Sequence, residues 1–252
     1  MTTSYTTAGV TVHHWPRSVR PAQVAIAVRY NTSSFQSPFT RTTQTTELPG
    51  ALHTATVDAP ALAPAAARDA RAFLASLRGM AGRFVLGVYP CRYAPPSAGG
   101  ADRSTTIPLT ADFTTLTGDT TLVTADATTI RLETTFTVTS APNTTTLNGT
   151  LWANSARAPL QVGSYISWDD ASGWRHLHNV TAMTHTVSTG AAVLTVAPPM
   201  RALPGPSTPI HVHAPSGIFM LTGDDAATLR PEGTRHSLTV DAVQAHPLQV
   251  TA

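Results

Sequence analysis

The chain has 252 residues, enough to bury a substantial core in one large or two small domains. Its 16 basic residues are all arginine, its formal net charge is +2, and only 12% of its residues are charged. The arginines are scattered singly, which argues against binding of nucleic acid through a basic patch. A mean hydropathy near zero excludes a strongly charged disordered chain.

The N-terminal part is expected to combine strands with a polar first segment. Residues 1–23 are polar, with Trp15 as the one large apolar anchor. We expect them to form an arm that lies on a neighbouring subunit, or otherwise a frayed terminus. After them, β-branched residues and alternation predict strands at Val24–Tyr30, His53–Val57 and Arg83–Tyr89.

Between Leu62 and Arg78 the hydrophobic period becomes helical. Pro64 suits the first turn, and Gly79 stands where a left-handed C-cap is expected. One face of the predicted helix 62–78 is apolar and should enter the core through Ala66, Ala70, Phe73, Leu74 and Leu77. Because the rest of the chain is typical of β-strands and loops, this single helix restricts the possible architectures.

The second half predicts short strands separated by turns. Residues 94–104 indicate a linker, and the threonine-rich stretch 105–141 contains one alternating strand at Ile130–Val138. Residues 147–201 are typical of a compact barrel of short strands, with predicted strands at Leu147–Trp152, Tyr165–Trp168, Arg175–Met183 and Ala192–Val196. A hairpin tip falls at 169–173, an exit linker at 202–209, and final strands at Ile210–Ala214, Gly217–Thr222 and Ser237–Ala245.

These elements predict a mainly β fold with a discontinuous layout. Residues 1–110 and 206–252 would form a β-sandwich domain that contains helix 62–78. Residues 111–205 would supply linker strands and an inserted small β-barrel module.

The histidine and aspartate pairs are the first candidates for chemistry. His176/His178 and His211/His213 are His-x-His pairs, and residues two apart on a strand point to one face, so each pair could present two imidazoles to zinc. His185 and the paired aspartates could supply a third ligand. No acidic or cysteine ligand stands at a set spacing, so we predict no metal site. The adjacent carboxylates Asp169/Asp170 and Asp224/Asp225 lie in turn-like contexts, where aspartate caps and bends the backbone.

A cluster of aromatic residues in the inserted module allows two interpretations. Trp152, Trp168 and Trp174, with Tyr165 nearby, could stack on sugar rings if they were exposed together. Alternatively, they fill the core of a small barrel. A carbohydrate site would use Trp168, Trp174 and Tyr165.

Signatures of catalysis and cofactor binding are missing from the sequence. It contains no G-x-S-x-G nucleophile elbow, no P-loop and no G-x-G-x-x-G. The single cysteine, Cys91, excludes an internal disulfide. We therefore expect a protein that is not an enzyme and holds no cofactor. The chain also has no signal-peptide pattern and no apolar window near the ~20 residues of a membrane span, so we expect it to be made in the bacterial cytoplasm.

Several segments of the chain resemble one viral family. They are Ser37-Pro38-Phe39-Thr40, Gln44, Pro49-Gly50-Ala51, the helix Ala70–Leu74, the closing Leu77–Phe84, Pro159–Ile166, Ala192–Arg201, Gly217–Leu221 and Ser237–Val243. Together these turns and apolar positions resemble the distal tail proteins of long, flexible-tailed bacteriophages. The resemblance covers most of the chain and contains no catalytic signature.

This resemblance implies a virion protein of the tail tip. Such a protein forms a homo-hexameric ring that joins the tail tube protein to the tail-tip hub protein, and genomic DNA passes through its lumen without specific binding. The resemblance also implies that the helix-bearing domain lines the channel and that the inserted module projects outward. The scarcity of positive charge fits a passage that does not grip phosphate.

Two other functions remain as alternatives. One is a host-surface carbohydrate-binding module of a tail or baseplate, acting through the tryptophans of the insert. The other is an esterase-like or glycosidase-like enzyme, which the missing motifs disfavour.

Overall fold

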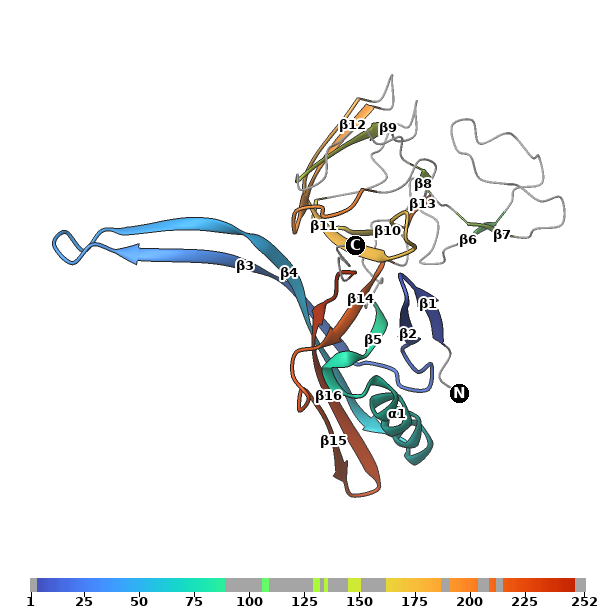
Figure 1. Cartoon of the computed structure of the whole chain (residues 1–252). Helices are drawn as coiled ribbons and strands as arrows, with labels where there is room; N and C mark the ends of the chain where they lie inside the picture. The colour runs from blue at the N-terminus through green and yellow to red at the C-terminus, as the bar shows by residue number, and fades with distance from the viewer. Residues whose placement is uncertain are drawn as a thin grey trace.

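The computed structural model describes residues 4–88, 106–108, 129–131, 134–135, 145–150, 162–186, 191–203, 209–211 and 215–247. The prediction of a mainly β protein is confirmed, because strands make up most of this described part and it contains one α-helix, α1 (Pro64–Leu77). The strands form one large sheet and one smaller sheet that lie against each other (Figure 1). Cys91 and Trp152 lie outside the described residues.

The large sheet joins the beginning of the chain to its end. Among the described residues it has eight strands, ordered β1-β2-β5-β14-β16-β4-β3, with β15 paired to β16. The bounds are β1 Ser4–Thr7, β2 Val10–His14, β3 Gln23–Gln36, β4 Thr43–Leu62, β5 Arg83–Gly87, β14 Ser216–Leu221, β15 Ala227–Glu232 and β16 Arg235–Gln244. Within it, β2 and β5 are parallel and the other neighbours are antiparallel. The hairpin β15–β16, which turns at Gly233, contains a strand that the sequence analysis did not predict.

The first residues belong to this sheet. β1 and β2 form a hairpin through Ala8 and Gly9, both at positive φ, and β2 then pairs with β5. Trp15 packs edge-on against Phe73, with ring centroids 5.4 Å apart. The expectation of an arm on a neighbour or a frayed terminus is therefore wrong for residues 4–15.

Helix α1 covers part of the sheet and seals its core (Figure 1). The predicted face is the buried one: Ala66, Ala70, Phe73 and Leu77 are buried, and Leu74 is half-buried against the same cluster. Beneath it lie Val57 of β4, Phe84 of β5 and Val240 of β16. Pro64 opens the helix at its first turn. The left-handed exit uses two residues, Arg78 at φ 52° and Gly79 at φ 70°.

The most unusual element is the long hairpin of β3 and β4. Its inner part pairs within the sheet, from Gln23 opposite Asp58 to Arg29 opposite Leu52. After an irregularity between Arg29 and Asn31, pairing continues from Asn31 opposite Leu48 to Gln36 opposite Thr43. This outer ribbon extends away from the rest of the described chain (Figure 1). We call residues 30–48 the arm.

The smaller sheet has the order β10-β11-β12-β9, with bounds β9 Thr146–Thr150, β10 Tyr165–Asp169, β11 Arg175–His185 and β12 Ala191–Ala197. These are the four strands predicted within 147–201. Its inner side is apolar, with Leu147, Ile166, Trp168, Val180, Leu194 and Val196 buried together with Met200 and Ile210. Two short pairs complete the described part: β6 (Thr106–Pro108) with β7 (Thr129–Arg131), and β8 (Thr134–Thr135) with β13 (Pro209–Ile210).

The chain leaves the large sheet after β5 and returns to it at β14. The backbone N–H of Val88 donates a 3.0 Å hydrogen bond to the carbonyl of Pro215, so the exit and the return are adjacent. Ile210 packs in the core of the smaller sheet, and His211 forms a β-bridge with Ser167. The return to the large sheet therefore falls after His211 and not at the predicted position 206.

The two sheets meet between β11 and β14. A Cβ added to Gly217 would lie 2.9 Å from the Leu177 Cβ, so only glycine allows this approach. Several side-chain hydrogen bonds cross the junction, among them Trp174 Nε1 to the Ala245 carbonyl at 3.0 Å, Gln244 Nε2 to the Leu177 carbonyl at 3.2 Å, and Tyr165 Oη to the Ile26 carbonyl at 3.3 Å.

Candidate functional site

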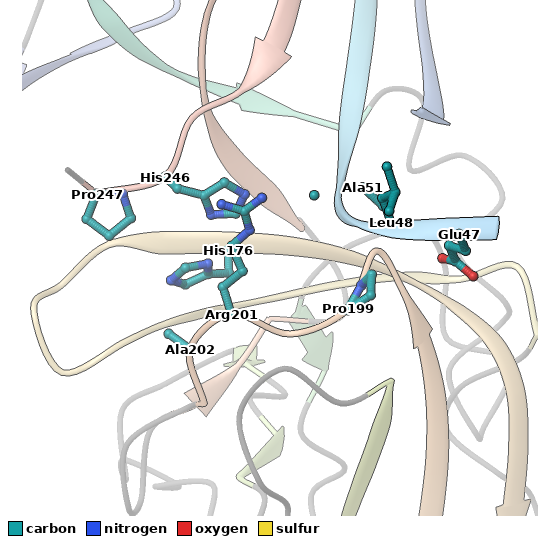
Figure 2. Close-up of a pocket in the computed structure, with 10 residues that line it drawn as sticks. Glu47, Leu48, Ala51, His176, Pro199, Arg201, Ala202, His246 and Pro247 are labelled. Carbon is teal, nitrogen blue, oxygen red and sulfur yellow. The ribbon is translucent and has the colours of Figure 1, made fainter. Parts of the chain in front are cut away.

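A pocket of about 700 Å³ lies at this junction, where the arm meets the sheets. Three parts of the chain line it: the base of the arm on β4, the segment 199–202 that follows β12 together with His176 of β11, and the residues 246–247 that follow β16. Its volume lies within the range of small-molecule sites. Figure 2 shows His176, Arg201 and His246 gathered at one end and Glu47 at the other.

His176 is held in place by the turn between β10 and β11. Asp170 Oδ1 accepts hydrogen bonds from the backbone N–H groups of Ser172 (2.8 Å) and Trp174 (3.0 Å), as aspartate does in turns. Its Oδ2 lies 2.9 Å from His176 Nε2. Because a carboxylate only accepts hydrogen bonds, Nε2 is the protonated ring nitrogen. Burial opposes the ionisation of Asp170, but hydrogen bonds from His176, Ser172 and Trp174 outweigh it and lower its pKa.

The rings next to His176 form a stack. His178 lies parallel to the Trp168 indole, with centroids 4.4 Å apart, and His246 lies 5.9 Å from His176. The Nδ1 of His178 donates to the Pro198 carbonyl at 2.9 Å, which leaves its Nε2 buried without a partner among the described residues. Burial, and then the nearby His176 ring, lower the pKa of His178 well below its ordinary value. His178 is therefore a buried, neutral polar group at the centre of this stack.

At the pocket itself, two groups are not satisfied by the described residues. Both ring nitrogens of His246 are buried and have no hydrogen-bond partner there. Burial, followed by the charge of Arg201, lowers the pKa of His246 to about 3. Arg201 is exposed and forms no ion pair within the described part of the chain. This end of the pocket thus carries an uncompensated positive charge beside an unpaired imidazole.

His53 lies in the same junction and is fully buried on β4, with its ring 5.9 Å from Tyr165. Neither of its ring nitrogens makes a hydrogen bond of good geometry, although the backbone of Leu177 and Ala27 lies near enough to oppose part of the effect of burial. Burial lowers the pKa of His53 to about 4.

The His-x-His pairs do not form a metal centre in the described structure. His176 and His178 share one side of β11, as the strand period predicts. Their rings, however, are hydrogen-bonded to Asp170 and to the Pro198 carbonyl, respectively. His213 lies outside the described residues, and His185 is described only in its backbone. Within the described ranges, no three His, Cys, Asp or Glu side chains converge as metal ligands.

The aromatic residues proposed for sugar binding are core residues. Trp168 is buried in the smaller sheet, and Trp174 is buried at the junction with Val12 and Ile218. Tyr165 is half-buried against the large core. Neither indole face is open to a sugar ring, so the alternative of an exposed stacking surface is corrected to the core interpretation.

The aspartate pairs have structural contacts. Asp169 forms a two-pronged ion pair with Arg175, at 2.7 Å for both hydrogen bonds. Asp224 Oδ1 accepts from the backbone N–H of Met80 at 3.0 Å and so fixes the exit of helix α1.

The sequence analysis did not single out Arg201 or His246. They stand 45 residues apart in the sequence (246 minus 201). Arg201 ends the segment Ala192–Arg201, where it was given no role, and His246 lies in none of the segments singled out. No local signal could have paired them, because only the return of the chain to the large sheet brings them together.

No helix of the described residues has the length and apolar character needed to cross a membrane. No protein-family model matches the sequence, and no curated protein matches it significantly.

Proposed function

We propose that this chain is a structural virion protein of a bacteriophage tail tip, where copies of it close into a ring, hexameric by the resemblance, between the tail tube and the tail-tip hub. DNA passes through the lumen of this ring without specific binding. The proposal rests on the family resemblance and on one structural observation, the arm.

The arm presents large apolar side chains that the described part of the chain leaves exposed. Tyr30 is 51% exposed, Phe35 65% and Phe39, at its tip, 95%. A two-stranded ribbon is only marginally stable in water without a surface to pack on. Exposed aromatic side chains on such an element mark an interaction site.

A second copy of the chain is the occupant that these features favour. β3 is an edge strand of the large sheet, and a free edge accepts another strand. The arm carries few charges, with Arg41 and Glu47 as the charged residues between 31 and 48, so copies can approach without strong repulsion. A head-to-tail contact that closes on itself forms a ring and covers every arm.

The direct test is electron microscopy and native mass spectrometry of the purified chain. We expect rings with six-fold symmetry and an open centre. Particles that remain monomers at concentrations used for imaging would contradict the proposal.

Variants test the role of the arm separately. Replacing Thr32–Glu47 by an Asn-Gly turn closes the hairpin at the pair Asn31 and Leu48, and should give a folded monomer. The double variant Phe35→Ser/Phe39→Ser should weaken assembly. Met80→Ser is the matched control, because Met80 is also exposed, 41%, but lies outside the arm. Equal assembly of all three variants would exclude the arm as the contact.

A further inference from the structure

The pocket at the base of the arm contains groups that lack a partner. Arg201 carries a full charge there with no ion pair in the described structure, and both nitrogens of His246 are buried without hydrogen bonds. A buried polar group without a partner is destabilising, and this applies to the His246 ring. The exposed Arg201 adds an unpaired positive charge beside it, so a ligand with an anionic acceptor would satisfy both groups.

We propose that this pocket binds the carboxylate or phosphate group of a small organic anion, held between the Arg201 guanidinium and the His246 ring. Arginine suits this role because its planar group presents two parallel donors to a carboxylate or phosphate. A neutral imidazole adds one N–H donor.

The remaining walls fit the organic part of such a molecule. Leu48, Ala51 and Pro199 give an apolar surface along the cavity (Figure 2). Gly50, at φ 118°, lines the wall beside Arg201. Glu47 lies at the end of the pocket away from Arg201 and His246 (Figure 2). There its carboxylate can accept a hydrogen bond from a ligand hydroxyl group without facing the anion.

The charges around the anion position favour an anion over a cation. The nearest aspartate to the histidines, Asp170, is committed to His176 and to its own turn. After burial, the largest influence on His246 comes from Arg201, whose guanidinium is a permanent positive charge. A metal cation would meet this positive side without a carboxylate ligand.

The proposal does not depend on ring formation, because one chain supplies all the groups. Binding is measured by isothermal titration calorimetry on the purified full chain with two anionic probes, D-glucuronate and glycerol 3-phosphate. D-glucose and glycerol serve as their neutral counterparts. We expect saturable binding of at least one anion at one site per chain and none of either neutral compound; the preferred anion identifies carboxylate or phosphate.

Three substitutions assign the site. Arg201→Gln should lower the affinity for the bound anion by about tenfold or more, the usual effect of losing a charge-assisted pair. His246→Gln should lower it by a smaller factor, and Arg68→Gln, on the exposed face of helix α1, should leave it unchanged. Circular dichroism verifies folding, and Arg201→Lys, which keeps the charge but not the planar fork, should bind with intermediate affinity.

Binding of neither anion, equal binding of the neutral counterparts, or equal losses in Arg201→Gln and Arg68→Gln would each overturn the proposal.

Discussion

Gly79 illustrates how a single residue determines a local arrangement. It follows helix α1 at φ 70°, and a Cβ built on it would lie 2.2 Å from Asp224 Oδ1, the atom that accepts the Met80 N–H. The sequence alone predicted a left-handed helix end at this glycine. It did not predict the contact with Asp224, which lies 145 residues further along the chain (224 minus 79). Helix α1 is thereby fixed to the loop between β14 and β15.

We predict that Gly79→Ala is more destabilising than Gly233→Ala. Both glycines have positive φ, 70° and 59°, but nothing lies within 4 Å of a Cβ at Gly233. The control should therefore cost only the backbone strain of about 1–2 kcal/mol. Gly79→Ala should cost about 1 kcal/mol more, because Asp224 must move and lose its hydrogen bond. Urea unfolding measures both; equal losses would mean that the Asp224 contact contributes nothing.

The buried histidines make stability depend on pH. The pKa of His53 is lowered from 6.5 to about 4 by burial, so between these values the unfolded chain binds a proton that the folded chain does not. Its contribution is complete above pH 6.5 and is lost as the pH falls toward about 4. A shift of this size corresponds to on the order of 3 kcal/mol. His246, with a pKa of about 3, and His178 act in the same direction.

We predict that the free energy of unfolding falls steeply between pH 6.5 and about pH 4, and that His53→Gln reduces this slope. His14→Gln, at an exposed position on β2, is the matched control and should keep the slope. Urea titrations at several pH values measure it. A slope that His53→Gln leaves unchanged would show that His53 is not the responsible group.

Elements differ in how far their sequences predict them. Helix α1 was predictable because one face is buried and the other exposed, so apolar residues recur with the helical period along its sequence. The inner part of β3 alternates between exposed and half-buried residues, and the strand was predicted there. Beyond Arg29 both faces of the ribbon are exposed, so no alternation remains to mark it. The sequence did not predict the arm, because the arm faces no core formed by the described residues.

Phe73 and Phe39 provide a matched test of this distinction. Phe73 is fully buried between Trp15 and Phe84, whereas Phe39 is 95% exposed. Phe73→Ala should cost about 3–5 kcal/mol through lost burial and the cavity it leaves. Phe39→Ala should change the stability of the monomer by less than about 0.5 kcal/mol. Thermal or urea unfolding measures these losses. Phe73→Ala is made in the arm-shortened monomer and compared with that monomer, and Phe39→Ala is made in the full chain and compared with the unmodified full chain. A small loss for Phe73→Ala would contradict the assigned core face.

At the scale of the whole molecule, the order of strands in the chain differs from their order in space. The late strand β14 lies between β5 and β16, so the last strands and the first ones share the large sheet. The predicted boundary was early because Ile210 is apolar and strand-like, and only its packing shows that it belongs with the smaller sheet. The pocket was not predictable for the same kind of reason: Arg201 and His246 become neighbours only through this long-range closure.

The ends of β5 and β14 lie next to each other in the large sheet. Val88 and Pro215 are joined by a backbone hydrogen bond, and Gly87 pairs with Ser216 in an antiparallel register. Replacing residues 89–214 by Asn-Gly would therefore turn β5 and β14 into an ordinary hairpin with a two-residue turn. The shortened chain keeps α1 and every strand of the large sheet, so we expect it to fold cooperatively.

It should also be less stable than the full chain. Leu177 and Trp174 would be lost, which uncovers Phe219 on one side and Val12 and Ile218 on the other. Circular dichroism and thermal unfolding measure both expectations. A second deletion, of residues 142–204 alone, is the comparison, since it removes β9 to β12 but keeps the original connections. If only the second variant fails to fold, the cause is the segments that it keeps and the first variant lacks, residues 89–141 and 205–214. If the first variant shows no cooperative transition, residues 4–88 and 215–247 do not form an independent core, and the smaller sheet is part of the folding unit.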